Sequence, residues 1–443
     1  MLLEAPVIKV TPPGPRARAV VEGDSELLMQ SFIRWYPLVI KRGFGSLVED
    51  VDGNVYIDFN SGIAVLNVGH SNPRVVEAIR GQAGLFTHYS LTDFYYELAV
   101  EYTRELREIV PISDSKVFYT NSGAESVEGS IKVVRGYFKG SRPYIVAFIG
   151  AFHGRTYGAM SLTASKPVHR RHFHPLLPGV IHVPYPYPYR CPFNSTSPEE
   201  CGEAALAYIE DWVFERLVDP SEVSSIIFEP ILGEGGYVVP PENFLPGLEK
   251  TARKHGILLV ADEVQTGFGR SGKWFAIQHW NITPDVMALA KAIASGLPLG
   301  AIVGRKEIMS LPPGSHANTF GGNPIALAAA KATLEILREG VIERVDKLGR
   351  EAIKYLEERL KETPIVGEVR GKGFMIGIEL VKDRKTKKPA REELNRILTE
   401  TFKKGVLAIG GGISTLRIAP PLTIEEELLF KGLDIIIETI KEA

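Results

Sequence analysis

The stretch GILLVADEVQTGFGR, residues 256–270, joins an apolar strand to a cluster of polar side chains. The apolar run 257–261 has the length of a core strand, and it ends directly at Asp262 and Glu263. Because unpaired carboxylates are costly to bury, two acids at the end of a core strand need specific partners. The stretch therefore predicts a buried strand that carries acidic groups to a site, with Gln265 close behind.

Similar apolar runs recur along the chain between segments of helical periodicity. They are SKVFYTNSG (115–123), YIVAFIG (144–150), SSIIFEP (224–230) and LGAIVG (299–304). Near-continuous apolar strands that alternate with helices are typical of a mostly parallel sheet covered on both faces. We therefore predict an α/β fold whose three-layer α/β/α large domain spans residues 76–334.

The two ends of the chain have a different pattern. The segment GSLVEDVDGNVYIDF (45–59) predicts a hairpin around Asp52 and Gly53. After about residue 335, a long charged amphipathic helix and further helices alternate with single strands. Residues 1–75 and 335–443 are therefore expected to form a smaller α+β domain.

Composition excludes several classes of protein. The 443 residues carry a formal net charge of -2, which argues against nucleic-acid binding. No apolar run approaches the roughly 20 residues of a membrane span, and the N-terminus lacks a basic leader with an apolar stretch. The two cysteines, Cys191 and Cys201, lie in a proline-rich loop, and we expect free thiols in a reducing cytoplasm and no metal site.

Polar residues stand where each predicted strand ends. In an open parallel sheet, ligands bind beyond the carboxyl ends of the strands. The strand ends at residues 121–123, 152–154, Glu229 and 262–263 are therefore expected to face one crevice.

Lys291 is the most reactive candidate in that crevice. It lies in VMALAKAIASGLPLG (286–300), and burial among apolar residues lowers the pKa of a lysine so that it can form a Schiff base with a carbonyl. For a lysine considered alone, a side chain that extends to solvent is the commoner alternative. Asp262 could supply the second group that such a Schiff base requires, because pyridoxal 5'-phosphate (PLP) needs a carboxylate beside its pyridine nitrogen. Gln265 could donate a hydrogen bond to the ring's phenolate oxygen.

Two further segments could bind the same cofactor. In TNSGAES (120–126), Ser122, Gly123 and Ala124 open a helix whose free amide groups can bind a phosphate, although small residues also cap helices for structural reasons alone. In AFHGRT (151–156), Phe152 is either a flat face for the ring or an ordinary core residue.

The order and spacing of these motifs resemble the class III (ω-type) aminotransferases of the fold-type I PLP enzymes. The resemblance covers nearly the whole chain and rests on NSGAESVE, AFHGRT, IIFEPILGEGG, LLVADEVQTGFGRSGKWFA, PDVMALAKAIASGLPLGAIVG, TFGGNP and LRIAPPLTI. It implies that Lys291 forms the Schiff base and moves the proton, and that Asp262 pairs with the pyridinium. It implies a homodimer or a dimer of dimers with shared active sites. The remaining cofactor contacts that it implies are Ser122, Gly123, Ala124, Phe152, His153, Glu229, Val264, Gln265 and, from the neighbouring subunit, Thr319.

The resemblance also suggests how substrates are recognised. Arg417 would bind the α-carboxylate of 2-oxoglutarate, and Glu234 would neutralise Arg417 when a donor with only a distal amine is bound. Arg155 would hold the carboxylate at the far end of the donor. These residues imply transfer of the distal amine of an ω-amino acid to 2-oxoglutarate, giving a semialdehyde and glutamate.

The donor is open between ornithine and 4-aminobutyrate. Asp93, beside Thr92, could pair with the second ammonium of ornithine, or it could cap the helix that follows. Ile63 favours 4-aminobutyrate, because eukaryotic ornithine aminotransferases carry tyrosine at that position and 4-aminobutyrate enzymes carry isoleucine. An amino-acid racemase of the same family is an alternative activity, with Glu234 as its second proton donor, and it would need no 2-oxoglutarate.

Overall fold

The computed structural model describes residues 4–443 and has a seven-stranded sheet at its centre. Strand β10 runs antiparallel to both of its neighbours, β4 and β9, and the other pairs in the sheet are parallel. This arrangement confirms the expected mostly parallel sheet. In spatial order the strands are β4 (Ser115–Thr120), β10 (Gly300–Arg305), β9 (Val286–Leu289), β8 (Leu258–Asp262), β7 (Val223–Phe228), β5 (Tyr144–Ile149) and β6 (Val180–Pro184).

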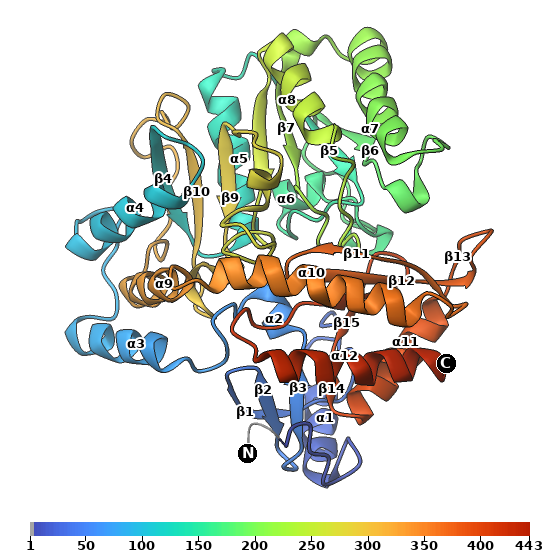
Figure 1. Cartoon of the computed structure of the whole chain (residues 1–443). Coiled ribbons are helices and arrows are strands. Elements are labelled where there is room, and N and C mark those ends of the chain that lie inside the picture. Colours follow the sequence, from blue (N-terminus) through green and yellow to red (C-terminus); the bar gives the residue numbers. More distant parts are fainter. Residues whose placement is uncertain (1–3) are drawn as a thin grey trace.

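Helices cover both faces of this sheet. Ile145 of β5 shares a buried cluster with Val134 of helix α5 (Gly123–Tyr137). Phe148, on the other face of β5, packs against Phe244 of helix α8 (Phe244–His255) with ring centroids 5.8 Å apart. The three layers of the large domain are therefore as expected, and they form the upper half of the molecule in Figure 1. The other helices before residue 340 are α1 (Pro15–Leu27), α2 (Ser61–Ala64), α3 (Pro73–Leu85), α4 (Glu97–Ile109), α6 (Tyr157–Leu162), α7 (Pro198–Ala207) and α9 (Pro324–Leu337).

The two ends of the chain meet in a smaller sheet. Strands β2 (Leu47–Asp50) and β3 (Val55–Asp58) form the expected hairpin, and β14 (Val406–Leu407) pairs with β3 in parallel. A strand from the C-terminal segment thus completes a sheet begun by the N-terminal segment, as predicted for the smaller domain, and the two segments lie together in the lower half of Figure 1. The limits at residues 75 and 334 stay predictions, and helices α3 and α9 run across them.

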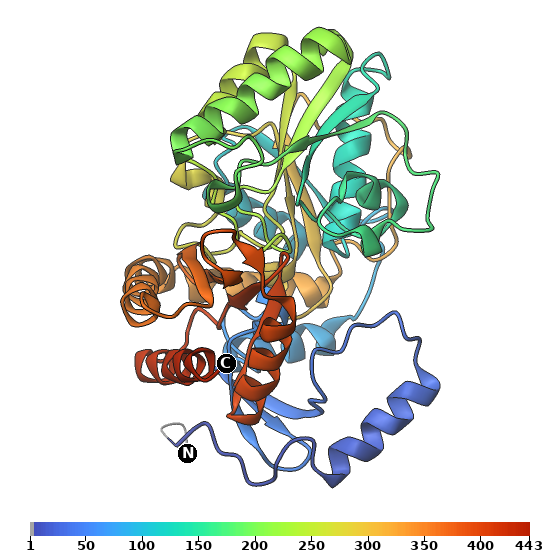
Figure 2. The same ribbon diagram turned by 90° about the vertical axis from the view of Figure 1, so that its right-hand side faces the viewer.

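The C-terminal segment also contains a second sheet with three helices beside it. Its strands are β11 (Val366–Lys372), β12 (Met375–Asp383), β13 (Lys388–Pro389), β15 (Ile409–Gly411) and β16 (Thr415–Ile418). Strand β1 (Ile40–Phe44) belongs to the N-terminal segment and pairs with β2 in the other small sheet. The helices are α10 (Val341–Leu360), α11 (Arg391–Lys403) and α12 (Glu426–Lys441). Helix α1 stands away from this body at the edge of the molecule (Figure 2). Short helical turns of other types are η1 (Pro167–His169), η2 (Pro188–Arg190), η3 (Tyr208–Phe214), η4 (Pro220–Glu222), η5 (Ala276–His279) and η6 (Lys291–Ala294).

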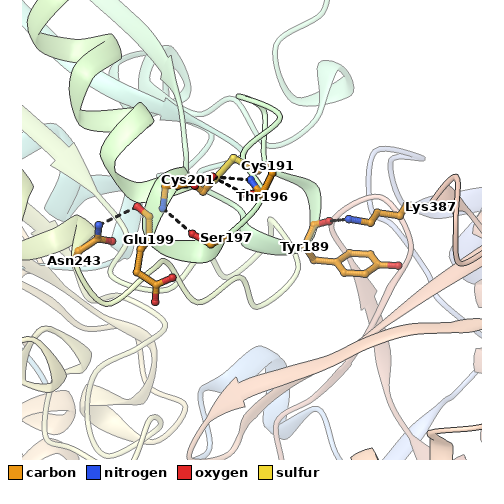
Figure 3. Close-up of a disulfide and its surroundings, with 9 residues drawn as sticks. Tyr189, Cys191, Thr196, Ser197, Glu199, Cys201, Asn243 and Lys387 are labelled. Carbon is orange, nitrogen blue, oxygen red and sulfur yellow. Dashed lines mark hydrogen bonds between the residues drawn. A yellow bond between two sulfur atoms is a disulfide. The ribbon is translucent and has the colours of Figure 1, made fainter.

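The expectation of free thiols is wrong. Cys191 and Cys201 form a disulfide, with their Cα atoms 6.0 Å apart (Figure 3). The expectation treated both cysteines as loop residues, but α7 begins at Pro198 and holds Cys201 in a fixed position facing the loop. The cysteines therefore give no support to a reducing compartment.

No helix within residues 4–443 is long and apolar enough to cross a membrane.

Candidate active site

A cavity of about 450 Å³ opens at the carboxyl ends of the parallel strands. It brings together most of the residues predicted to bind the cofactor. Val65 and residues 296–299 also line it. Residues 296–299 belong to the motif that contains Lys291, but neither they nor Val65 were predicted as site residues. The predicted residues in its wall are Ser122, Gly123, Ala124, Phe152, His153, Glu229, Glu234, Asp262, Val264, Gln265 and Lys291.

Lys291 enters the cavity directly after β9. Burial first, and then the charge of Arg417, lowers the pKa of its ammonium to about 8. Its backbone has a φ of 47°, in a left-handed region that costs a non-glycine residue roughly 1 kcal/mol. An amine with this pKa is partly neutral near pH 7 and can act as a nucleophile or a base.

Asp262 ends β8 and is held by two partners. Its Oδ2 lies 2.7 Å from Nδ1 of His153, and its Oδ1 accepts a hydrogen bond of 3.0 Å from the amide of Val264. The side chain is buried, so these two contacts fix the direction in which the carboxylate faces. The other ring nitrogen of His153 is buried and has no partner within residues 4–443.

Glu229, at the end of β7, ties neighbouring loops together. Its two oxygens accept hydrogen bonds from the amides of Phe152 (2.8 Å) and Gly233 (2.9 Å). Burial and the nearby charge of Asp262 raise the pKa of Glu229 to about 7. The residue thus links the loop that carries Phe152 to the loop that carries Glu234.

Glu263 has a different role from Asp262. Its carboxyl group accepts hydrogen bonds from the amides of Ala276 (2.9 Å) and Ile277 (2.7 Å), at the start of η5, and from the hydroxyl of Thr266. It does not line the cavity and faces the backbone at the start of η5 instead. Burial raises the pKa of Glu263 to about 7.

The two glycines of the opening stretch are required by packing. A Cβ at Gly269, where φ is 87°, would lie 2.9 Å from Leu422 Cδ1 and 3.0 Å from Ile342 Cγ1. A Cβ at Gly267 would lie 2.8 Å from the carbonyl oxygen of Glu263. Gly269 therefore allows contact with the C-terminal segment, which the sequence reading did not foresee.

The N-terminus of α5 forms a cradle for an anion. Ser122 caps the helix by accepting a hydrogen bond from the amide of Glu125. The amides of Gly123 and Ala124 have no acceptor within residues 4–443. A Cβ at Gly123 would lie 2.7 Å from Val264 Cγ1, so only glycine leaves this approach open. Free amides and the helix dipole together favour a phosphate here.

These features fit the cofactor that the resemblance implies. The α5 cradle suits its phosphate, Asp262 suits a protonated ring nitrogen, and Lys291 suits its carbonyl. The buried Oε1 of Gln265 has no partner within the described residues, so no hydrogen bond to this oxygen fixes the amide, and its NH2 group can turn to donate to the ring's phenolate oxygen.

Glu234 lies between two cations. Its Oε2 is 3.1 Å from Nη2 of Arg417, and its Oε1 accepts a hydrogen bond of 2.6 Å from Nζ of Lys166. Burial alone would raise the pKa of Glu234, but Arg417 and Lys166 outweigh burial and hold the pKa below its usual range. The sequence reading missed Lys166, because its contact with Glu234 spans 68 residues and no local motif marks it.

The other predicted substrate residues lie outside this cavity. Arg155 is exposed, with its guanidinium carbon 5.6 Å from the ring centroid of Phe152. Thr92 donates a hydrogen bond to the carbonyl of Asn318. Phe320, two residues later in the chain, is exposed. Ile63, Thr92, Asp93 and Thr319 are all exposed and do not line the cavity of their own chain. Helix α4 begins at Glu97 with Tyr96 as its N-cap, so the alternative of Asp93 as that cap is wrong.

The comparisons with known proteins agree with this site. A family model described as Aminotransferase class-III matches residues 32–440. An alanine/serine racemase of Pyrococcus horikoshii is 42% identical over 452 residues, covering 100% of this chain and 94% of the relative. A 4-aminobutyrate aminotransferase of Mycobacterium leprae is 43% identical over 406 residues, covering 90% of each chain.

A solved structure carries the cofactor itself. It is an amine transaminase from an uncultivated Pseudomonas species in the PLP-bound form, with a TM-score of 0.84 and 30% identity over 90% of this chain and 94% of that one. The family match, this neighbour and the fitting cavity lead to one conclusion: the protein belongs to the class III aminotransferases and is a PLP-dependent enzyme.

Proposed function

We propose that the enzyme transfers the distal amino group of an ω-amino acid to 2-oxoglutarate, with ornithine as the preferred donor and 4-aminobutyrate as a second donor. The products are a semialdehyde and glutamate. The observation that carries this proposal is the contact of Glu234 with both Arg417 and Lys166.

Bound PLP supplies a carbonyl that bonds to amines and an electron sink for the charge that develops at the adjacent carbon. Lys291 holds or releases a proton beside that carbon, since its lowered pKa leaves part of the population neutral. Asp262 orients the ring nitrogen and keeps it protonated, and His153 holds the carboxylate in place.

The ion pair of Glu234 and Arg417 explains how one site accepts two kinds of substrate. A donor that enters by its distal amine brings no carboxylate to Arg417, and Glu234 then neutralises the buried guanidinium. When 2-oxoglutarate enters, its α-carboxylate takes the place of Glu234 on Arg417. Lys166 gives Glu234 a second cation, so that the displaced carboxylate stays paired.

Asp93 supports ornithine over 4-aminobutyrate. Its carboxylate is exposed and forms no ion pair within residues 4–443. In a homodimer whose subunits share active sites, Asp93 and Thr92 would reach the partner's cavity and bind the α-ammonium of ornithine. 4-Aminobutyrate has no second ammonium, and Ile63 is the one residue that favours it. Arg155 would hold the carboxylate at the far end of either donor.

Exposed apolar side chains support the homodimer. Leu27, Met29 and Ile33, close together in sequence, are exposed by 80%, 72% and 62% in the single chain, although monomers rarely expose large apolar side chains in groups. In such a dimer, Thr319 would reach the phosphate of the partner's cofactor.

Racemisation is the second candidate, because a relative that covers the whole chain is named an alanine/serine racemase. It would need a proton donor opposite Lys291. Glu234 is a poor donor, since Arg417 and Lys166 lower its pKa and keep it ionised at neutral pH.

A donor panel tests the proposal. Ornithine, lysine, 4-aminobutyrate, and D- and L-alanine are each assayed with and without 2-oxoglutarate, following glutamate formation and the optical rotation of the amino acid. Glutamate from ornithine only with 2-oxoglutarate supports the proposal, and turnover of alanine without any oxo acid overturns it.

Asp93 is tested separately by Asp93→Leu, with Asp93→Asn as a variant of matched size. Both variants should lower kcat/KM for ornithine by about 10-fold or more, because they remove one charged contact. The value of kcat/KM for 4-aminobutyrate should change by less than twofold. Equal losses for both donors would remove Asp93 from donor recognition.

A further inference from the structure

The disulfide anchors a segment that leaves the large domain. Residues 185–193, here called the arm, follow β6 and end near Cys191, which is bonded to Cys201 in the first turn of α7. That turn is itself fixed, because Asn243 donates a hydrogen bond of 3.0 Å to the carbonyl of Glu199 (Figure 3). The arm is thus held to the large domain at both of its ends.

The middle of the arm binds the C-terminal domain. Tyr187 donates a hydrogen bond of 2.8 Å to Oε2 of Glu379, and Nε of Arg190 donates one of 2.9 Å to Oε1 of the same carboxylate. Lys387 returns a hydrogen bond of 2.7 Å to the carbonyl of Tyr189 (Figure 3). Glu379, on β12, is 2% exposed and therefore depends on these partners to compensate its charge.

Glu379 in turn holds Arg370 of β11. Nη2 of Arg370 lies 3.0 Å from Oε2 of Glu379, and it also donates a hydrogen bond of 2.6 Å to the carbonyl of Gly236. Nε of Arg370 donates one of 3.1 Å to the carbonyl of Tyr237. Gly236 and Tyr237 belong to the loop 233–237, which carries Glu234.

The same loop seats Arg417. Nη1 of Arg417 donates a hydrogen bond of 3.3 Å to the carbonyl of Gly233, and its guanidinium carbon lies 5.4 Å from the ring centroid of Tyr237. A continuous chain of contacts therefore runs from the disulfide, through the arm, Glu379 and Arg370, to both sides of the ion pair between Glu234 and Arg417.

We propose that Glu379 and Arg370 are positioning residues for the Glu234–Arg417 pair, and that the disulfide-anchored arm holds them in place. This role deepens the proposed function, because it assigns these residues to the binding of the α-carboxylate of the acceptor. They touch neither substrate nor cofactor and act through the loop 233–237.

The two states of the pair depend differently on this support. In the closed state, with Glu234 bound to Arg417, the two opposite charges hold each other. In the open state, the carboxylate of the acceptor takes the place of Glu234. In the open state, Arg417 receives no help from Glu234 and keeps its position through Gly233, Gly410 and Tyr237. Loosening the loop should therefore weaken the binding of an α-carboxylate more than the binding of an ω-amine donor.

Three variants of the holoenzyme test the proposal: Tyr187→Phe, Glu379→Gln and the double variant Cys191→Ser/Cys201→Ser. Arg384→Lys is the matched control, since Arg384 binds the carbonyls of Lys361, Thr363 and Val366 in the same domain and does not contact the loop 233–237. The readouts are the KM for 2-oxoglutarate, kcat/KM for the donor, and the Kd of glutarate, a dicarboxylate that does not react. Thermal unfolding reports the stability of each variant.

We expect the KM for 2-oxoglutarate and the Kd of glutarate to rise by fivefold or more in Glu379→Gln and in the double variant, with a smaller rise in the same direction in Tyr187→Phe. Donor kcat/KM should stay within twofold of wild type, as should every value for Arg384→Lys. Variants that lower only the unfolding temperature, or a control that shifts the glutarate Kd equally, would overturn the proposal. The glutarate Kd needs no turnover, so it decides this proposal even if the donor panel rejects transamination.

Discussion

Replacing the carboxyl group by an amide should have different effects at the adjacent acids Asp262 and Glu263. Asp262→Asn and Glu263→Gln each replace a carboxyl group by an amide of nearly equal size. Asp262 faces the cavity, whereas Glu263 binds the backbone at the start of η5. We therefore expect the first change to damage cofactor binding and the second to damage stability.

The size of the first effect follows from the contacts of Asp262. Removing one partner of a buried, hydrogen-bonded charge pair costs about 2–5 kcal/mol, which corresponds to a rise of about 30-fold or more in the Kd of PLP. The amide can keep both contacts, because its oxygen can accept from the amide of Val264 and its NH2 group can donate to Nδ1 of His153 when the imidazole carries its proton on Nε2. The free energy of unfolding of the cofactor-free protein should therefore change little.

Glu263→Gln places an amide NH2 group near the amides of Ala276 or Ile277, where the carboxyl oxygens accept hydrogen bonds. One unsatisfied buried group costs about 1–3 kcal/mol. The pKa of Glu263 is raised from 4.5 to about 7, so the folded state keeps a proton that the unfolded state releases above its own pKa. The contribution of Glu263 to stability therefore falls as pH rises from 4.5 to 7, by about 3 kcal/mol in all.

Denaturant unfolding of the cofactor-free protein at pH 5 and pH 8, together with PLP titration, measures both effects. Glu229 also has a raised pKa and adds a slope of the same sign, so the quantity to compare is the difference between wild type and Glu263→Gln. Between pH 5 and pH 8, the free energy of unfolding should fall less in Glu263→Gln than in wild type. The PLP affinity of this variant should stay near that of wild type. If Glu263→Gln lost PLP as severely as Asp262→Asn, the assignment of the two acids would be refuted.

Three further predictions concern single positions. With a pKa of about 8, the neutral fraction of Lys291 rises from about 9% at pH 7 to about 50% at pH 8, so the rate of PLP uptake by cofactor-free protein, followed by absorbance, should rise about fivefold and level off above pH 9. Gly269→Ala should lower the free energy of unfolding by about 1–3 kcal/mol in denaturant titrations, through strain at positive φ and the clash with Leu422. Gly123→Ala should weaken PLP binding, because its Cβ would meet Val264 in the anion cradle, and should cost less stability than Gly269→Ala, because positive φ adds strain only at Gly269; titration and thermal unfolding measure the two effects.

What the sequence predicted well depended on local order. The run that ends at Asp262 forms a fully buried strand, and the small residues at 122–124 open α5, so both cofactor contacts followed from the position of a side chain at the end of a strand or the start of a helix. These are properties of neighbouring residues, which a single sequence displays.

What it missed depended on contacts between distant segments. Gly269 packs against Leu422, and Lys166 reaches Glu234, in both cases across many residues. The disulfide is local in sequence, but it was missed because both cysteines were assigned to a proline-rich loop and the start of α7 at Pro198, which positions Cys201, was not foreseen. In each case the deciding quantity was the relative placement of two elements.

Glu234 links the selection of substrate to the reactivity of Lys291. The charge of Arg417 lowers the pKa of Lys291, and the charge of Glu234 raises it. Glu234→Gln would leave Arg417 uncompensated, and the pKa of Lys291 should fall further below 8. In the uptake assay, the midpoint of the pH profile should therefore move to lower pH, while kcat/KM for an ω-amine donor falls more than the KM for 2-oxoglutarate changes. An unchanged midpoint would show that Arg417 and Glu234 do not act on Lys291 through their charge, and the ion pair would then serve carboxylate binding alone.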